Sequence, residues 1–243
     1  MIKKLFNKIF KFETTPEATI IAAVDMYTNG IGFEGTLSWK IPSDMECFKK
    51  TTSLSNNKKI KNILICGRVT YESFGSKPLP NRHFIVLTKD PDRYFRSNFK
   101  IFGDSKHNLI EGSVNQKNDV LIMNTGDGRV VIYTNSLDHL DYCLKRIKKD
   151  YGLGKIFVIG GSKIYKEFLT KDIKGLKLTR CLITEIDSFK SDSITNIFEN
   201  RFDTYFPMKE MIDNFEWEKL EYLEKGVTLR SYKLKRTPDV GKG

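Results

Sequence analysis

Short apolar runs recur along the chain and alternate with polar or helix-like segments, which predicts strands and helices in alternation. The segment 136–149 has apolar residues at helical spacing, with Ser136 as the expected N-cap. A closing antiparallel hairpin is predicted over 217–223 and 228–234. The runs that predict strands cover residues 20–24, 63–66, 84–87, 130–133, 155–159 and 178–186, and the first of these is expected to be buried.

A glycine-rich loop leaves the first predicted strand and leads into a helix. Pro42 suits the first position of that helix, Ser43 is the expected N-cap, and acidic Asp44 favours the positive end of the helix dipole. The spacing places Asp44, Met45, Phe48 and Thr52 on one face. Against an apolar wall the Asp44 carboxylate could recognise a planar pair of donors, and burial would disfavour its charged form. The alternative is that Asp44 only stabilises the first helical turn.

Two further strands end in glycine and open helices, at Gly67-Arg68-Val69-Thr70 and at residues 160–165. The unpaired N–H groups of such a helix start can bind an anion, and the guanidinium of Arg68 suits a phosphate. Any strand-to-helix turn can look like the first motif. The second begins Gly160-Gly161 and is not the Gly-x-Gly-x-x-Gly dinucleotide fingerprint.

Charge and composition narrow the choice of function. The 243 residues carry a net charge of +11, spread over both halves, which indicates a lysine-rich surface more than a nucleic-acid-binding module. No apolar run reaches the length of about 20 residues needed to span a bilayer. The four cysteines lack a disulfide or metal spacing and the three histidines are far apart, so we expect reduced thiols, no metal site and a cytoplasmic location.

Taken together, these motifs resemble the dihydrofolate reductase family. The resemblance rests on Gly30-Ile31-Gly32, Ser38-Trp39, the Asp44 helix and Gly160-Gly161 before an Ile-Tyr helix, in the order that the family requires. Ser38 departs from the family's usual proline. The resemblance implies an α/β fold with a central, mostly parallel twisted sheet, flanking helices and an antiparallel C-terminal edge, in a single domain over residues 18–236.

Segments outside this core are expected as additions. Residues 1–17 form a basic amphipathic extension, and 237–243 a linker-like tail. Two insertions are expected, one over about 90–129 with an added strand at 120–123, the other over 187–202. Residues 203–207 match a family segment that packs near the loop containing Gly32.

The resemblance also implies site residues. Asp44 would bind the pterin, oriented by Thr184, while Arg82 would bind the α-carboxylate of the glutamate tail and Thr88 and Lys89 the adenosine 2′-phosphate. The expected catalytic residues are Asp44, Trp39, Thr184 and Leu37. Those expected to bind substrate are Ala23, Asp44, Met45, Phe48, Ser73, Phe74, Leu79, Arg82, Ile159, Tyr165 and Thr184. Those expected to bind the cofactor are Ala23, Ile31, Gly32, Leu37, Gly67, Arg68, Val69, Thr70, Leu87, Thr88, Lys89, Ile159, Gly160, Gly161, Ser162, Lys163, Ile164 and Tyr165.

Finer expectations follow from the same resemblance. Gly160 and Gly161 would be joined by a cis peptide, and the Ser162 hydroxyl would donate to a phosphate. Asp44 is the only ionisable group expected in this cleft, and it would serve protonation of the substrate, directly or through water. Without the resemblance, Arg82 would be read as an exposed turn residue.

The implied activity is NADPH-dependent reduction of 7,8-dihydrofolate to 5,6,7,8-tetrahydrofolate, which supports one-carbon metabolism and thymidylate synthesis. Dihydrofolate and antifolates are the implied small-molecule ligands, and a thymidylate synthase domain or partner is left open. Two alternatives stand beside this activity. One is a related NADPH-dependent pterin or pyrimidine reductase, and the other is a non-enzymatic nucleic-acid-binding module.

Overall fold

The computed structural model describes residues 14–55, 57, 59–102, 120–125, 127–191 and 202–235, with the backbone alone for 97–102. The basic extension expected over 1–17 lies outside this part except for its last four residues, and the tail 237–243 lies wholly outside it. Of the second expected insertion, only 187–191 and 202 are described.

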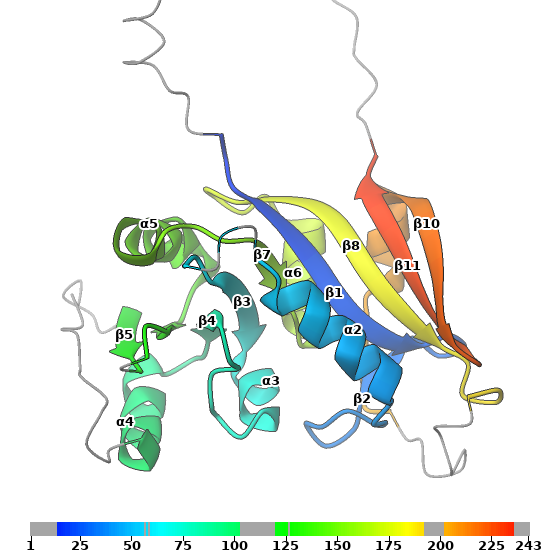
Figure 1. Cartoon of the computed structure of the whole chain (residues 1–243), viewed down its shortest axis with the longest axis horizontal. Helices are drawn as coiled ribbons and strands as arrows, with labels where there is room; N and C mark the ends of the chain where they lie inside the picture. The colour runs from blue at the N-terminus through cyan, green and yellow to red at the C-terminus, as the bar shows by residue number, and fades with distance from the viewer. Residues whose placement is uncertain are drawn as a thin grey trace, which may run out of the picture.

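A nine-stranded sheet forms the centre of the described chain (Figure 1). Its six inner strands pair in parallel, in the order β8-β1-β7-β3-β4-β6, and strands pair antiparallel at both edges. The expected parallel sheet with an antiparallel C-terminal edge is therefore confirmed. The strands are β1 (Glu17–Asp25), β3 (Asn62–Gly67), β4 (Arg82–Leu87), β5 (Val120–Asn124), β6 (Val130–Thr134), β7 (Ile156–Val158), β8 (Lys177–Ile186), β10 (Phe215–Glu224) and β11 (Val227–Leu234).

Helices cover both faces of this sheet, because each face is apolar and must be shielded from water. On one face lie α5 (Leu140–Tyr151), α6 (Ser162–Thr170) and α7 (Met208–Asn214). On the other lie α2 (Pro42–Ser53), α3 (Arg68–Ser73) and α4 (Pro91–Phe102). The strands β3, β4 and β6 are consequently buried along nearly their whole length.

A second, two-stranded sheet pairs β2 (Gly30–Gly32) with β9 (Thr204–Tyr205). The carboxylate of Asp203 accepts the N–H of Glu34 at 2.8 Å. The expected packing of 203–207 against the Gly32 loop is therefore confirmed.

The segment 90–129 begins with α4 and ends with β5, the outermost strand beside β6. The strand predicted at 120–123 is confirmed and pairs antiparallel with β6. Its residues are buried, between 1% and 7% exposed, so this end of the segment belongs to the core and not to the surface. The apolar run Val-Leu-Ile-Met can be buried there because α4 covers the edge of the sheet.

Two predicted helix caps have different outcomes. The Ser136 hydroxyl accepts the N–H of Asp138, as predicted, at the 3₁₀ turn η1 (Leu137–His139), which runs into α5. The prediction for Ser43 is wrong. Pro42 already takes a helical position, so Ile41 is the N-cap and Ser43 lies inside α2.

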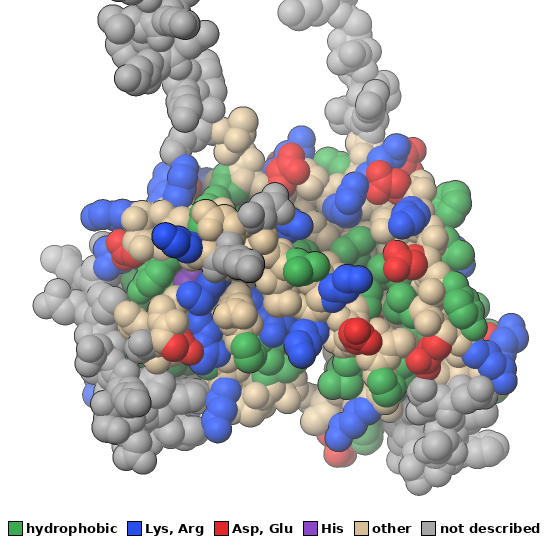
Figure 2. All heavy atoms as spheres, viewed as in Figure 1, with side chains coloured by type: hydrophobic (Ala, Val, Ile, Leu, Met, Phe, Trp, Pro, Cys, Tyr) green, Lys and Arg blue, Asp and Glu red, His purple; other side chains and the backbone are tan. Residues whose placement is uncertain are grey.

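Within the described residues, no helix is long and apolar enough to cross a membrane. That same part of the chain contains no group of three or more histidine, cysteine or acidic side chains placed to hold a metal ion. Basic side chains are spread over the face shown in Figure 2, with acidic side chains among them.

His83 is a buried titratable group in the sheet. Its side chain is 0% exposed, and Nδ1 accepts the backbone N–H of Val130 at 3.1 Å, which ties β4 to the start of β6. Burial, with a smaller contribution from the charge of Lys61, lowers the pKa of His83 from 6.5 to about 4. The side chain is therefore neutral in the folded protein at neutral pH.

This burial makes stability depend on pH. Between pH 6.5 and about 4 the unfolded chain binds more protons at this position than the folded chain. The free energy of unfolding should therefore fall as the pH is lowered through that window. Denaturant unfolding at a series of pH values should show a smaller slope for His83→Gln, which cannot titrate. Equal slopes for the two proteins would contradict the assignment.

Candidate active site

A cleft of about 1890 Å³ opens at the carboxyl ends of the inner strands. In a parallel sheet these ends share one edge, so residues far apart in sequence meet there. Gly67 ends β3, Thr88 follows β4, Asn135 follows β6, and Ile159 follows β7; all four line the cleft. The face of α2 completes one wall.

Most of the predicted site residues meet in this cleft. Those that line it are Ala23, Ile31, Gly32, Leu37, Asp44, Met45, Phe48, Gly67, Arg68, Val69, Thr70, Ser73, Phe74, Leu79, Arg82, Leu87, Thr88, Lys89, Ile159, Gly161, Ser162, Lys163, Ile164 and Tyr165. Three predicted residues, Trp39, Gly160 and Thr184, do not line the cleft.

Asp44 lies in the first turn of α2 and faces the cleft. Burial raises the pKa of its carboxyl, and a side-chain hydrogen bond with Thr184 opposes that rise. Thr184 is placed for this contact because β1 and β8 pair it with Ala23, which lines the cleft. The predicted Thr184 contact is confirmed. Asp44 is therefore a desolvated carboxyl with a fixed orientation.

Other carboxyl groups also line the cleft, so the expectation of a single ionisable group there is wrong. Glu46 is exposed, and both oxygens of Glu72 accept from Nη1 of Arg68 at 2.7 Å. Asp44, in contrast, is only partly exposed, and burial raises the pKa of its carboxyl. That property separates it from surface carboxylates.

A cluster of glycines separates the starts of α3 and α6. A Cβ on Gly67 would lie 3.4 Å from Ile164, one on Gly161 3.5 Å from Thr70, and one on Gly160 2.9 Å from the ring of Tyr165. Gly160 also has φ +103°, which only glycine adopts readily, and its peptide to Gly161 is cis, as predicted. Side chains here would fill the space between the two helix starts.

Both helix starts present backbone to the cleft. The first N–H groups of a helix lack an intrahelical partner, and in α3 and α6 no side chain at the N-cap accepts from them. The Ser162 hydroxyl donates to the Tyr205 carbonyl at 2.5 Å. The prediction that this hydroxyl serves a phosphate is therefore wrong, and Ser162 contributes backbone instead. Tyr165, in the first turn of α6, is fixed to β1 because its hydroxyl donates to the carbonyl of Ile21 at 2.8 Å.

Arg82 is a buried arginine at another part of the cleft. It is only 4% exposed, and it donates from Nη1 to Thr52 Oγ1 at 2.8 Å and from Nε to the Pro80 carbonyl at 3.0 Å. The reading as an exposed turn residue is thus wrong. No carboxylate pairs with it among the described residues. Burial and the nearby charge of Arg129 lower the pKa of Arg82. The carboxylate of a ligand would offset the unfavourable free energy of burying this charge.

Trp39 packs in a small core with Ile41, Ile186 and Val227, and its ring meets Phe202 edge-on at 5.7 Å between centroids. Its exposed fraction is 6%. The indole therefore supports the loop between β2 and α2 from behind, and its predicted catalytic role stays a prediction.

The cleft has further lining residues that the sequence reading missed. Arg93 and Tyr94 of α4 and the stretch 135–138 line it, as does 171–174 after α6. The place of 135–138 in the cleft could have been predicted from the sequence, because this stretch follows an inner strand at the same edge of the sheet. The place of α4 could not be predicted, because no motif marks 90–102.

Comparison with known proteins identifies the family. A sequence profile described as dihydrofolate reductase matches residues 17–145, more than half of the chain. The chain belongs to the dihydrofolate reductase family. It is 33% identical over 143 residues to the dihydrofolate reductase of Saccharomyces cerevisiae. The aligned region covers 58% of this chain and 54% of the yeast protein. It is 31% identical over 161 residues to a bifunctional dihydrofolate reductase-thymidylate synthase of Zea mays, covering 65% of this chain and 24% of that protein.

The dihydrofolate reductase fold extends beyond the profile match. A solved dihydrofolate reductase of Enterococcus faecalis, complexed with NADP(H) and RAB-propyl, superposes with a TM-score of 0.56. It covers 91% of this chain and 98% of the solved chain at 23% identity. The second half, from α5 to β11, therefore has the family fold as well. The chain spans about half the length of the yeast relative and about a quarter of the maize one.

The Asp44–Thr184 hydrogen bond generates a prediction. Its donor stabilises the charged carboxylate, so Thr184→Val, which keeps the shape of the side chain, should raise the pKa of Asp44 further. A carbon-detected NMR titration of the labelled carboxyl would measure this. Thr179→Val, also on β8 but bonded to Glu17, is the matched control and should leave the pKa of Asp44 unchanged. An unchanged pKa in Thr184→Val would contradict the contact.

Proposed function

We propose that this protein reduces 7,8-dihydrofolate to 5,6,7,8-tetrahydrofolate with NADPH. The observation that carries the proposal is a single cleft lined by a desolvated, oriented carboxyl at Asp44 and a buried guanidinium at Arg82. A folate has a planar ring edge of donors at one end and carboxylates at the other. Family membership and the neighbour complexed with NADP(H) support the same activity.

The residues present fit NADPH. Gly67–Thr70 and 161–165 would hold the diphosphate with backbone N–H groups, in the space that the glycines leave open. Thr88 and Lys89 would hold the adenosine 2′-phosphate with a hydroxyl and a cation. Ala23, Ile31 and Leu37 line the cleft where the nicotinamide would lie.

NADPH supplies a hydride when bound, and the protein supplies orientation and proton control. Asp44 would bind the 2-amino group and N3 of the pterin, with Thr184 fixing its carboxylate. Reduction of the C=N bond adds a proton at N5 as C6 gains the hydride. A carboxyl whose pKa is raised by burial can serve this demand near neutral pH, directly or through a water.

The first alternative, another pterin or pyrimidine reductase, would share the cofactor cradles but needs neither Asp44 nor a buried Arg82. The second, a nucleic-acid-binding module, rests on the net charge of +11 alone. On the face shown in Figure 2, acidic side chains lie among the basic ones.

Two ligand and partner expectations belong to the same proposal. Antifolates that imitate the pterin edge would compete at Asp44. A thymidylate synthase, as a further domain or a partner, would share folate with this reductase. The name of the bifunctional maize relative supports that coupling.

The proposal is tested by the absorbance of reduced nicotinamide near ~340 nm with the purified protein. We expect loss of absorbance that requires dihydrofolate and is faster with NADPH than with NADH. Binding of NADPH without turnover of dihydrofolate would favour the first alternative. Salt-sensitive binding to DNA with no turnover would favour the second.

Asp44→Asn should fold as the wild type and lose turnover by at least about a hundredfold at neutral pH, because the amide cannot exchange the proton. Steady-state kinetics measure the effect, and circular dichroism checks the fold. Glu46→Gln, on the same helix and exposed, is the matched control. Wild-type turnover in Asp44→Asn would remove Asp44 from the reaction.

Arg68→Ala should raise the KM for NADPH about five- to tenfold, because a charged donor near the phosphates is lost. It also leaves Glu72 without its partner beside the anionic ligand. The kcat and the KM for dihydrofolate should change little. An unchanged KM for NADPH would place Arg68 outside the cofactor site.

A further inference from the structure

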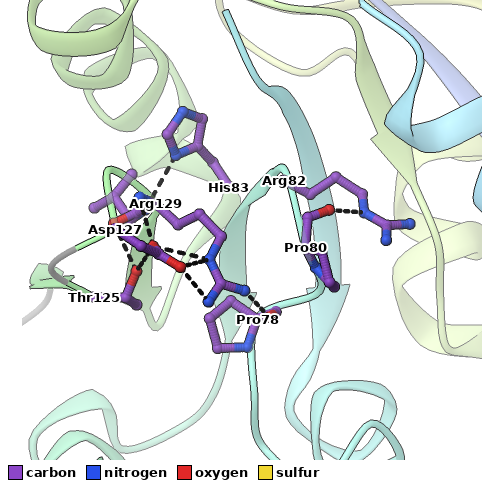
Figure 3. Close-up of polar contacts among 8 residues, drawn as sticks. Pro78, Pro80, Arg82, His83, Thr125, Asp127 and Arg129 are labelled. Carbon is purple, nitrogen blue, oxygen red and sulfur yellow. Dashed lines mark hydrogen bonds and ion pairs between the residues drawn. The ribbon is translucent and has the colours of Figure 1, made fainter. Parts of the chain in front are cut away.

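The turn Pro78–Pro80, which joins α3 to β4, is held by two arginines (Figure 3). Leu79 and Pro80 line the cleft. Arg82 donates from Nε to the Pro80 carbonyl at 3.0 Å, and Arg129 donates from Nη1 to the Pro78 carbonyl. The two guanidiniums lie on either side of the turn in Figure 3. The same short turn therefore links Arg129 to the arginine that lines the cleft.

Arg129 is itself held in place. Its Nε donates to both oxygens of Asp127, at 2.9 and 2.7 Å, and its Nη2 lies 2.5 Å from Oδ2. Thr125 donates to Oδ1 of the same carboxylate at 2.5 Å. Although partial burial acts to raise the pKa of Asp127, hydrogen bonds from Arg129 and Thr125 lower it to about 2. The Asp127 carboxylate is thus charged at neutral pH, and together with the Arg129 guanidinium it forms a unit that is nearly neutral.

The strands that carry the two arginines are also fixed to each other. Arg82 begins β4, and Arg129 immediately precedes β6, its parallel neighbour. The buried His83 ring accepts the N–H of Val130, next to Arg129. A shift of the turn relative to these strands would therefore break contacts on both sides.

We propose that Arg129, anchored by Asp127, is a positioning residue for Arg82. Arg129 fixes the turn Pro78–Pro80 through the Pro78 carbonyl. The Pro80 carbonyl of the same turn then orients the Arg82 guanidinium toward the acidic tail of the substrate. This inference rests on the proposed function and extends it, because it assigns a role in substrate recognition to a residue outside the cleft lining. Arg129 acts through the turn and not by touching the substrate.

A rival role for Arg129 is purely electrostatic, as a second positive charge that attracts the carboxylate. The two roles differ in what Asp127 does. If Asp127 anchors Arg129, its loss should weaken substrate binding. If Arg129 acts by charge alone, Asp127 screens it, and its loss should strengthen binding of an anion.

The test uses Arg129→Gln and Asp127→Asn with two substrates. One is dihydrofolate, and the other is a 6-alkyl-7,8-dihydropterin, which has the reducible ring and no carboxylate tail. Both variants should raise the KM for dihydrofolate by about tenfold, a partial loss of a charge-assisted contact. The KM for the dihydropterin, the KM for NADPH and both kcat values should stay at wild-type levels. Arg129→Lys should restore part of the KM, because it keeps one donor for the Pro78 carbonyl.

Arg180→Gln is the matched control, since it breaks an arginine–carboxylate pair with Glu218 away from the cleft. It should leave all KM values unchanged. The proposal is overturned if Arg129→Gln keeps the wild-type KM for dihydrofolate, if it raises the KM of both pterin substrates equally, or if Asp127→Asn lowers the KM for dihydrofolate. Should Arg129→Gln fail to fold, Asp127→Asn decides. A wild-type protein that reduces neither pterin overturns the proposed function itself.

Discussion

Parallel pairing of six strands brings their carboxyl ends to one edge of the sheet, and the two glycine-rich helix starts depend on that alignment. The helix starts proposed to hold the cofactor follow β3 and β7, and Thr88 and Lys89, proposed for the 2′-phosphate, follow β4. Apolar burial on both faces fixes the alignment, because a one-residue slip of an inner strand would turn core side chains to the opposite face. The site is thus a consequence of how the core is buried.

Two ionisable groups mark the cleft, the half-buried Asp44 and the buried Arg82, and the charge of each is costly in the free protein. Asp44 is desolvated on α2, with Thr184 as the donor that keeps it oriented. Arg82 is buried with neutral partners, the Thr52 hydroxyl and the Pro80 carbonyl. Removing charges from water without an opposite charge is unfavourable, so both positions favour a ligand that completes them. A folate that binds both groups would offset the free energy of their desolvation, whereas a ligand that lacks either end would not, and this difference would give specificity.

Much of this arrangement could be predicted from the sequence, because apolar runs mark inner strands and glycine follows strands at ligand sites. The Asp44 face of α2 and the Ser136 cap depend on local spacing alone, and both hold in the structure. Ser43 was misplaced because Pro42 competes for the helix start. The Ser162 hydroxyl and the burial of Arg82 depend on partners more than 20 residues away along the chain, Tyr205 and Thr52, which local patterns cannot give.

A crystal structure with NADP⁺ and folate would test the central claim most directly. The claim is that Asp44 and Arg82 bind the pterin and the carboxylate tail, the two ends of one substrate. The account predicts the 2-amino and N3 edge of the pterin on the Asp44 carboxylate, and a tail carboxylate within about 3 Å of the Arg82 guanidinium. A pterin bound away from Asp44, or a tail that does not approach Arg82, would contradict it.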